Sequence, residues 1–476
     1  MRLIKRFILF FLLLASAHLQ AQKIAVADLR ADLDFLQTVL YKGHQGVFLY
    51  NKKDSLDLFF NALRVHLKGD SVSMAQAQVT VRLAVARVRD GHTSVQTPFY
   101  SEKTQILPFT ISVVGEKAYI IGNYSGDTTL KRGTEIRTIN GEPVSTVIRL
   151  GHLIQSSDGF NQTFAESVAS VYFARHQSLF FGVHKMNVIN VLSDKGVSYE
   201  RKVGSMSRLD LLKLLNVKVK RPPEEKPILK FKDMVLRRDT VDKNTALLQL
   251  GSFPNGRYKR FYRRAFRWLD EQHIQNLVVD VRYNTGGNVD NMGYLLAKIL
   301  DEPFSYRYER QRHTHIGRYF NFKGKAVLVA IWMRYNLHPR FKHGRESNLN
   351  LRYWLLKPRT KHNFNGKVYV LTNGWSFSSA SMCASFLKNR NQATVIGIET
   401  GGNETGNCGG GYPQLKLPHT KFKVRFPVYH LRYAVGKTDK GRGVMPDYPV
   451  HYKIGDILEG KDLEMDQLHS LLKNRS

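Results

Sequence analysis

The stretch from Leu277 to Asn288 reads LVVDVRYNTGGN. Its first half is a short run of apolar, largely β-branched residues, which is typical of a strand buried on both faces of a parallel sheet. Its second half is a turn with two consecutive glycines, Gly286 and Gly287. Glycines in such a turn let backbone N–H groups approach an anion closely, as an oxyanion-binding site requires. A phosphate loop would look similar, but the Gly-Lys-Ser/Thr ending of that motif is missing.

A second strand-to-helix junction follows about ninety residues later. Residues 371–381 read LTNGWSFSSAS, and a helix is predicted from about Ser378 to Lys388. A serine at this junction has its hydroxyl near the helix N-terminus, where the helix dipole and free N–H groups favour a developing negative charge. Taken alone, a serine-rich turn before a helix is more often an N-cap. A glycine-rich segment, GIETGGN at 397–403, is typical either of a loop near a site or of tight turns.

Strands and helices alternate through the C-terminal half. Strands are predicted over 246–250, 276–281 and 367–371, with helices between and after them. This alternation predicts an α/β fold with a mainly parallel sheet. The helix over 257–267 carries Arg260, Arg263, Arg264 and Arg267 on one face and aromatic residues on the other, which is typical of a solvated amphipathic helix.

The N-terminal half has a different pattern of predicted elements, with helices first and strands after them. Apolar spacing predicts helices over 29–40 and from Ser71, a reasonable N-cap, to Val88. Strands follow from residue 107, and Ile139-Asn140-Gly141 ends one of them in a strong hairpin signal. A proline-rich, charged stretch at 221–227 is typical of a linker.

Residues 1–22 combine a basic start, an apolar run over 7–14 and small residues up to Ala21. This pattern predicts a signal peptide cleaved near Ala21 and an exported protein, periplasmic or extracellular; an uncleaved membrane anchor is the alternative. The net charge of +33 favours contact with an anionic envelope surface, but no specific nucleic-acid motif is present. Cys383 and Cys408 lack the spacing of a zinc site, and we expect no metal or other cofactor.

Five motifs occur in series and resemble those of the tail-specific, C-terminal processing serine peptidases. They read DGHT at 90–93, DVRYNTGG at 280–287, SFSSAS at 376–381, GIETGG at 397–402 and GVMPD at 443–447. The stretch at 132–144 also resembles the peptide-binding PDZ domain, and DGHT is similar to the tricorn-like and retinoid-binding-protein-like branch. The resemblance implies an α/β catalytic core of the ClpP/crotonase-like type, without a cofactor.

The resemblance also implies the site. The nucleophile falls on Ser378, or on Ser379 if one residue is inserted, with His92 as the base. The oxyanion would be held by Ser379 N–H with Gly286 or Gly287. Asn403 stands where Ser-Lys members carry lysine, and Ser381 stands where a glutamate is usual, so these two family groups are missing. The acid that orients His92 is not identified; Asp439, near the last motif, is one hypothesis.

The resulting organisation is a signal peptide at 1–22, a helical region at 23–98, a PDZ-like β domain at 99–205, a linker at 206–235 and a catalytic domain at 236–476 with an insert at about 303–359. The expected function is an endopeptidase or C-terminal processing peptidase that cleaves unstructured polypeptide segments through an acyl-enzyme. Two alternatives are a catalytically weak relative that binds peptide or lipid, and an adhesin-like binder of acidic polymers.

Overall fold

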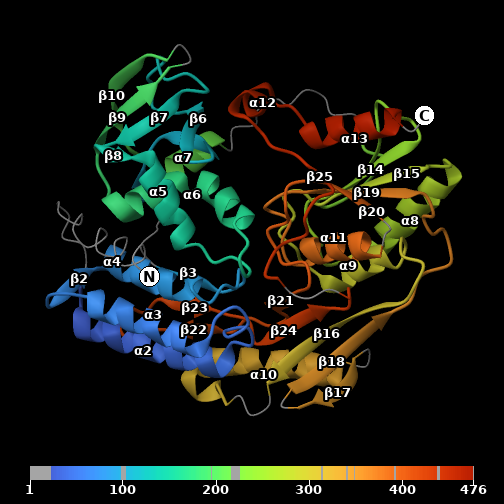
Figure 1. Cartoon of the computed structure of the whole chain (residues 1–476), viewed down its shortest axis with the longest axis horizontal. Helices are drawn as coiled ribbons and strands as arrows, with labels where there is room; N and C mark the ends of the chain where they lie inside the picture. The colour runs from blue at the N-terminus through green and yellow to red at the C-terminus, as the bar shows by residue number, and fades with distance from the viewer. Residues whose placement is uncertain are drawn as a thin grey trace.

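The computed structural model describes residues 23–97, 103–193, 196–215, 226–311, 315–338, 341–347, 349–390, 393–436 and 440–474. The expected signal peptide, part of the expected linker and Asp439 lie outside these residues. Figure 1 shows a mixed α/β chain with an N-terminal group of helices, an antiparallel sheet beside it and a larger α/β part that carries the C-terminus.

The N-terminal group contains α2 (Val26–Gly43), α3 (Lys53–His66) and α4 (Met74–Ala86). The leucines at 29, 33, 36 and 40 are completely buried along α2, as their spacing predicts. The predicted start of the next helix at Ser71 was wrong. Ser71 begins strand β2 (Ser71–Ser73), which pairs with β1 (Lys23–Ala25), and Ser73 caps α4 in a capping box with Gln76.

Helix α3 was not predicted, although Leu56, Phe60 and Leu63 mark its buried face at helical spacing. These three side chains lie in the same hydrophobic core as the leucines of α2. The helix completes the packing around α2 and α4.

The antiparallel sheet contains six strands in the order β10-β9-β7-β6-β5, with β8 paired to β7. The strands are β5 (Phe109–Val114), β6 (Lys117–Asn123), β7 (Glu135–Ile139), β8 (Glu142–Pro143), β9 (Met186–Leu192) and β10 (Ser198–Gly204). Helices α5 (Val144–Leu153) and α6 (Thr163–Phe181) pack against it. The predicted hairpin at Asn140-Gly141 is confirmed: both residues have positive φ, of 53° and 84°, and join β7 to β8.

The C-terminal part is built on a seven-stranded sheet in the order β12-β13-β14-β15-β19-β20-β25, parallel from β14 onward. Its strands are β12 (Leu229–Phe231), β13 (Met234–Arg238), β14 (Thr245–Leu250), β15 (Asn276–Asp280), β19 (Lys367–Thr372), β20 (Ala393–Gly397) and β25 (Tyr448–Pro449). Parallel pairing, as predicted, brings the carboxyl ends of β15 and β19 side by side, with Asp280 opposite Leu371.

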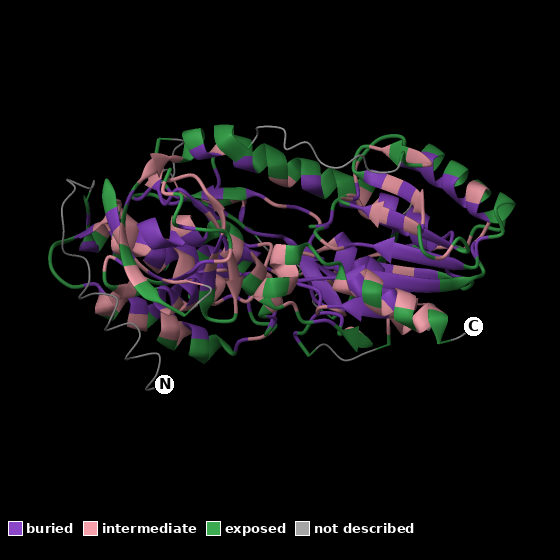
Figure 2. Ribbon diagram, turned by 90° about the horizontal axis from the view of Figure 1, so that it is seen from above, coloured by how far each residue is buried: buried purple, intermediate pink, exposed green. Residues whose placement is uncertain are grey.

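Helices cover both faces of this sheet. On β15, Leu277 and Val279 belong to the core shared with α8 (Tyr258–Glu271), α9 (Val289–Leu296) and α11 (Ser379–Asn389), whereas Val278 packs in a separate cluster with Leu468 of α13 (Leu463–Lys473). A short helix, α12 (Ile454–Glu459), precedes α13. Helix α8 is amphipathic as predicted, with its four arginines exposed. Figure 2 shows the sheet buried between exposed helix faces.

The segment over 303–359 forms β16 (Phe304–Gln311), η1 (Gly317–Tyr319), α10 (Phe322–Leu337), β17 (Lys342–Glu346) and β18 (Leu349–Leu356). It is not a separate lobe, because its strands share a five-stranded sheet, β17-β18-β16-β24-β21, with β21 (Gly406–Gly409) and β24 (Tyr429–Tyr433). Helix α10 exposes several large apolar side chains. None of the helices in the described ranges has the length and apolar character needed to cross a membrane.

Short pairings tie the N-terminal half to the rest. Strand β3 (Ser94–Gln96) pairs with β23 (Lys423–Arg425), which pairs with β22 (Gln414–Lys416). Strand β4 (Gln105–Ile106) pairs with β11 (Met206–Ser207), just before α7 (Arg208–Leu215). The pairing of β3 fixes the DGHT segment at 90–93 against the C-terminal part.

A buried histidine makes the fold sensitive to acid. His176 on α6 is 5% exposed, and burial, with Arg82 and Arg175 nearby, lowers its pKa to about 3. In the unfolded chain a histidine titrates near pH 6.5, so below that pH only the unfolded state takes up the proton. Stability is therefore complete above about pH 6.5 and is lost as the pH falls toward 3.

We expect His176→Leu to remove this term, which amounts to about 3 kcal/mol between pH 7 and pH 4. The measurement is the denaturant-unfolding free energy at both pH values. The exposed His451 offers the control, because a side chain in contact with solvent in both states makes little difference between them, and His451→Gln should leave the pH dependence as it is in the wild type. An unchanged pH dependence in His176→Leu would contradict the assignment.

Candidate active site

Ser378 is the N-cap of α11 and has an unusual backbone. Its φ of 57° and ψ of −120° are those of the first central residue of a type II′ turn, a position dominated by glycine. For a residue with a Cβ, such a conformation costs about 1–3 kcal/mol and is found mostly at functional sites. The surrounding hydrogen bonds impose it: Phe377 N–H donates to Asn284 O at 3.0 Å, and Ser381 Oγ donates to Ser378 O at 2.8 Å.

The glycine turn lies directly against this corner, as its residue types require. A Cβ placed on Gly286 would lie 2.7 Å from Ser378 Cβ and 3.0 Å from Ser379 N. A Cβ on Gly287, whose φ is 136°, would lie 2.4 Å from Phe253 O. Ser376 Oγ also donates to Val281 O at 2.8 Å, which ties the two loops together. The two strand ends that the sequence singles out therefore form one continuous surface.

The candidate oxyanion donors are not equivalent. Gly286 N–H donates to Asn284 Oδ1 at 2.8 Å, so it is already engaged. Within the described residues, no acceptor is found for the N–H groups of Gly287 and Ser379. Of the three predicted donors, these two are available to a negative oxygen.

The two candidate nucleophiles also differ. Ser379 is 2% exposed, and its hydroxyl donates to Gly287 O at 3.0 Å. Ser378 is only partly buried, and its side chain makes no cap hydrogen bond to α11. Of the two hydroxyls, that of Ser378 belongs to the more exposed residue and is not used to cap the helix.

His92 lies beside the same corner. Its ring centroid is 4.6 Å from that of Phe377, the residue before Ser378, and 5.7 Å from that of Tyr412. The imidazole is 10% exposed, and within the described residues neither ring nitrogen has a hydrogen-bond partner. The structure thus brings the DGHT segment to the serine corner. There the imidazole of His92, the candidate base, makes no hydrogen bond to any described residue.

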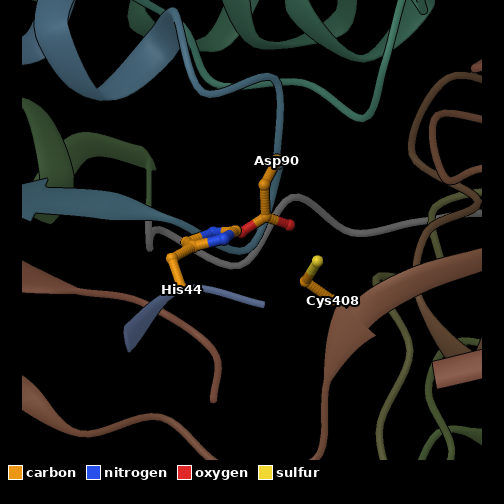
Figure 3. A group of neighbouring side chains, drawn as sticks. All are labelled: His44, Asp90 and Cys408. Atoms are coloured by element: carbon orange, nitrogen blue, oxygen red, sulfur yellow. The ribbon is translucent and has the colours of Figure 1, made fainter. Parts of the chain in front are cut away.

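Asp90, two residues before His92, also contacts a second histidine, His44; Figure 3 shows the ring of His44 beside the carboxylate of Asp90. Asp90 Oδ1 lies 3.8 Å from His92 Nδ1, and Asp90 Oδ2 lies 2.9 Å from His44 Nε2. Gly46 N–H donates to His44 Nδ1 at 3.0 Å, so the ring proton of His44 is on Nε2 and points at the carboxylate. Burial opposes ionisation of Asp90, but the hydrogen bond from His44 and the nearby imidazole of His92 hold its pKa well below the usual range.

Asp158, on the loop between α5 and α6, is a second buried carboxylate near His92. It accepts Gly91 N–H at 2.8 Å and Asn403 N–H at 3.3 Å. Burial raises its pKa to about 6, and the charge of Asp90 adds to this, while His92 acts in the opposite direction. Neither Asp158 nor His44 was a sequence candidate, because no local motif marks them and only the fold brings them to residues 90–92.

Other motif residues form hydrogen bonds that fix the segments around the site. Glu399 accepts Gly443 N–H at 2.7 Å and Asn161 Nδ2–H at 3.0 Å, which fixes the GVMPD segment. Asn403, at the position of the missing lysine, donates to Tyr50 Oη at 2.6 Å. Cys383 and Cys408 are both buried and are not joined in a disulfide. Asp439, the hypothetical orienting acid, lies outside the described residues.

A cavity of about 290 Å³ borders the site. Gly91 and Trp375 line it on the side of the serine corner, together with Phe164, which stacks on Phe377 at 4.8 Å between ring centroids. Arg82 on α4 and Arg175 on α6 also line it, so the cavity has both aromatic and basic side chains in its wall.

The strain at Ser378 has a measurable consequence. Both Ser378→Ala and Ser378→Gly remove the hydroxyl, but only glycine adopts φ of 57° and ψ of −120° freely. We expect Ser378→Gly to be more stable than Ser378→Ala by about 1 kcal/mol in urea unfolding. Equal stability, or a less stable glycine variant, would mean that the corner carries no strain.

The comparisons with known proteins agree with this geometry. Residues 244–450 match the model of peptidase family S41. The fold is similar to mature CPAF complexed with lactacystin, with a TM-score of 0.65 and 14% identity over 94% of this chain and 98% of that one. It is also similar to a putative peptidase from Parabacteroides merdae, with a TM-score of 0.50 and 15% identity over 94% and 96% of the two chains. Among curated proteins, no sequence matches the chain. The family match covers both strand-to-helix junctions, and residues 244–450 are therefore similar to peptidase family S41, a family of serine-type peptidases.

Proposed function

We propose that the chain cleaves polypeptides by acyl transfer, with Ser378 as the nucleophile and His92 as the general base. The observation that carries the proposal is the strained Ser378 corner packed against Gly286, with the His92 ring beside Phe377. His92 takes the proton of Ser378 as the hydroxyl attacks the peptide carbonyl, and returns it to the leaving amine. Water then hydrolyses the acyl-enzyme by the same route.

The oxyanion of each tetrahedral intermediate would accept the N–H groups of Ser379 and Gly287. Such donors stabilise charge that appears only in the transition state, and removal of one costs about 10²–10³ in kcat. Gly286 contributes by its lack of a side chain, which allows the two loops to meet, rather than by donating its own N–H.

Asp90 is proposed as the acid that orients His92. It is buried and held ionised by His44, and its Oδ1, which accepts the backbone N–H of His92 at 3.3 Å, is 3.8 Å from His92 Nδ1. A small rotation of the ring would close this hydrogen bond and leave Nε2 as the proton acceptor. Asp158 adds a second negative charge that favours the imidazolium formed during the reaction. Asp90 thus replaces the hypothesis of Asp439.

The substrate is proposed to be an unstructured or C-terminal polypeptide segment. The six-stranded sheet with α5 and α6 would act as the PDZ-like domain expected from the sequence. It would bind the substrate segment as a strand added to the edge of the sheet. The cavity beside Trp375 would then receive a substrate side chain next to the scissile bond. We further propose export to the periplasm or beyond, on the pattern of residues 1–22, and contact with an anionic envelope surface through the net charge of +33.

A catalytically weak, peptide- or lipid-binding role is the second candidate. It is favoured by Asn403 and Ser381, which stand in place of the family's lysine and glutamate, and by the unengaged ring of His92.

Labelling with a fluorophosphonate separates the two functions. We expect the wild type to be labelled, Ser378→Ala to lose the label, and Ser379→Ala to keep it, because the hydroxyl of Ser379 already donates to Gly287 O. Equal, weak labelling of the wild type and Ser378→Ala would favour the binding role. Labelling that is lost only in Ser379→Ala would place the nucleophile one residue later.

The role of Asp90 can be tested against a matched buried pair. Asp90→Asn should lower kcat on an unstructured peptide by about 10²–10⁴, because an amide neither fixes the tautomer of His92 nor stabilises its positive form. Asp239 is also buried and pairs with a histidine, His469, at 3.0 Å, so Asp239→Asn is the control and should leave kcat within a factor of about two. Retention of wild-type kcat by Asp90→Asn would remove Asp90 from the mechanism.

A further inference from the structure

Three groups that can bind a metal converge at the base of the candidate active site. One carboxylate oxygen of Asp90, one of Asp158 and a ring nitrogen of His92 all lie within 4.8 Å of one another. Asp90 and Asp158 are 3% exposed and come from different parts of the chain. Only the fold assembles this set, so sequence spacing does not reveal it.

The charges at this point are unbalanced. Two carboxylates share a buried volume, where their mutual repulsion is only weakly screened by solvent. Hydrogen bonds offset part of this: His44 donates to Asp90 Oδ2, the backbone N–H of His92 donates to Asp90 Oδ1, and two further backbone N–H groups each donate to one oxygen of Asp158. The imidazole of His92 lies close to both carboxylates. A positive charge placed there would be stabilised by both carboxylates.

The ring of His92 is also short of partners. Its two nitrogens are buried, and no hydrogen-bond partner for either is found within the described residues. Buried polar atoms in folded proteins nearly always have a partner, and one that does not points to a missing ion, water or reacting group. The unpartnered imidazole therefore gives a second indication, independent of the carboxylates, that this position receives a ligand.

We propose that Asp90, His92 and Asp158 form a binding site for Zn²⁺ and that its occupancy switches the peptidase off. The inhibition, though not the binding, rests on the proposed role of His92 as the base. With Zn²⁺ bound to Nδ1, the ring proton of the neutral imidazole is on Nε2, so the nitrogen that would take the proton of Ser378 has no free lone pair. The bound cation also cancels the charge of the two carboxylates, so the field that favours the imidazolium is lost.

The ligand set favours zinc over other common divalent cations. Zn²⁺ accepts imidazole nitrogen and carboxylate oxygen at about 2.0–2.2 Å in a four-coordinate arrangement, in which a fourth position is open to water. Ca²⁺ and Mg²⁺ need about six or more oxygen ligands, which three side chains here do not provide. The separation of 3.8 Å between Asp90 Oδ1 and His92 Nδ1 is close to the distance between two ligands of one zinc ion.

A neighbouring group, His44, Asp90 and Cys408, has a similar composition but a different chemistry (Figure 3). Coordination through His44 Nε2 would move its proton to Nδ1, where it would face Gly46 N–H. Nε2 is moreover already bonded to Asp90 and to Thr93 Oγ1, at 2.9 and 2.8 Å. These contacts keep His44 a hydrogen-bond donor to Asp90 Oδ2. Oδ1 of Asp90 is the oxygen that lies nearer the ring of His92.

The test measures zinc binding directly, in the full-length Ser378→Ala background, so that it does not depend on turnover. We expect one tight site by equilibrium dialysis, a loss of at least about tenfold in affinity on adding Asp158→Asn, and little change on adding Cys408→Ser. Co²⁺ in place of Zn²⁺ should give d–d bands without a thiolate-to-cobalt charge-transfer band. Thermal melts without metal would show whether the Asp158→Asn protein is folded.

Equal affinity in all variants would mean adventitious binding to surface histidines, and loss of binding in Cys408→Ser would place the ion at the neighbouring group; either result overturns the proposal. If the Asp158→Asn protein fails to fold, the cobalt spectrum of the Ser378→Ala protein decides between the two groups. In the enzyme with Ser378 intact, Zn²⁺ should inhibit peptide cleavage reversibly, with recovery on adding a chelator. Zinc that binds as expected without inhibiting would instead refute His92 as the base.

Discussion

The parallel pairing of β15 with β19 is the constraint on which the site depends. It sets the carboxyl ends of the two strands side by side. The loops that follow them pack so closely that a single Cβ added to Gly286 would clash with Ser378. Gly286 allows this contact, and the hydrogen bonds from Phe377 N–H to Asn284 O and from Ser376 Oγ to Val281 O lock it. The strain at Ser378 is the local cost of the contact, and it turns the hydroxyl away from the helix-capping role that a serine at this position usually has.

Everything else in the site comes to this corner from elsewhere in the chain. His92 and Asp90 arrive on the loop between α4 and β3, which is fixed when β3 pairs with β23. Asp158 arrives on the loop between α5 and α6, and its carboxylate accepts the N–H groups of Gly91 and Asn403. The site therefore forms only when the N-terminal helices, the six-stranded unit and the C-terminal sheet are assembled, which is why its electrostatics is not a property of any one of them.

The burial of two carboxylates around one imidazole serves both proposals made here. A site that stabilises a transient imidazolium also stabilises any other cation of suitable size, because both respond to the same field. Catalytic competence and sensitivity to zinc are thus two consequences of one arrangement of charge. Arg282, in the same motif as Gly286, is the contrasting case. It forms ion pairs with Asp280, Asp462 and Glu464, so its charge is neutralised by contacts that hold α13 to the sheet.

The sequence by itself determined the parts of this protein whose signals are local. Hydrophobic runs and glycine turns identified the parallel sheet, the serine corner, the Asn140-Gly141 hairpin and the basic helix, because each depends on residues close together in the chain. It placed the start of α4 two residues early, since both Ser71 and Ser73 have the chemistry of an N-cap and only Ser73 has Gln76 three residues on. Tertiary structure alone decided that Gly286 is a spacer and not a donor, and that Asp158 lies beside His92 and His44 beside Asp90. The approach of Gly286 to Ser378, of Asp158 to Gly91 and of His44 to Asp90 joins residues that lie far apart in the sequence, where burial and hydrogen bonding, rather than any local pattern, set the role of a side chain.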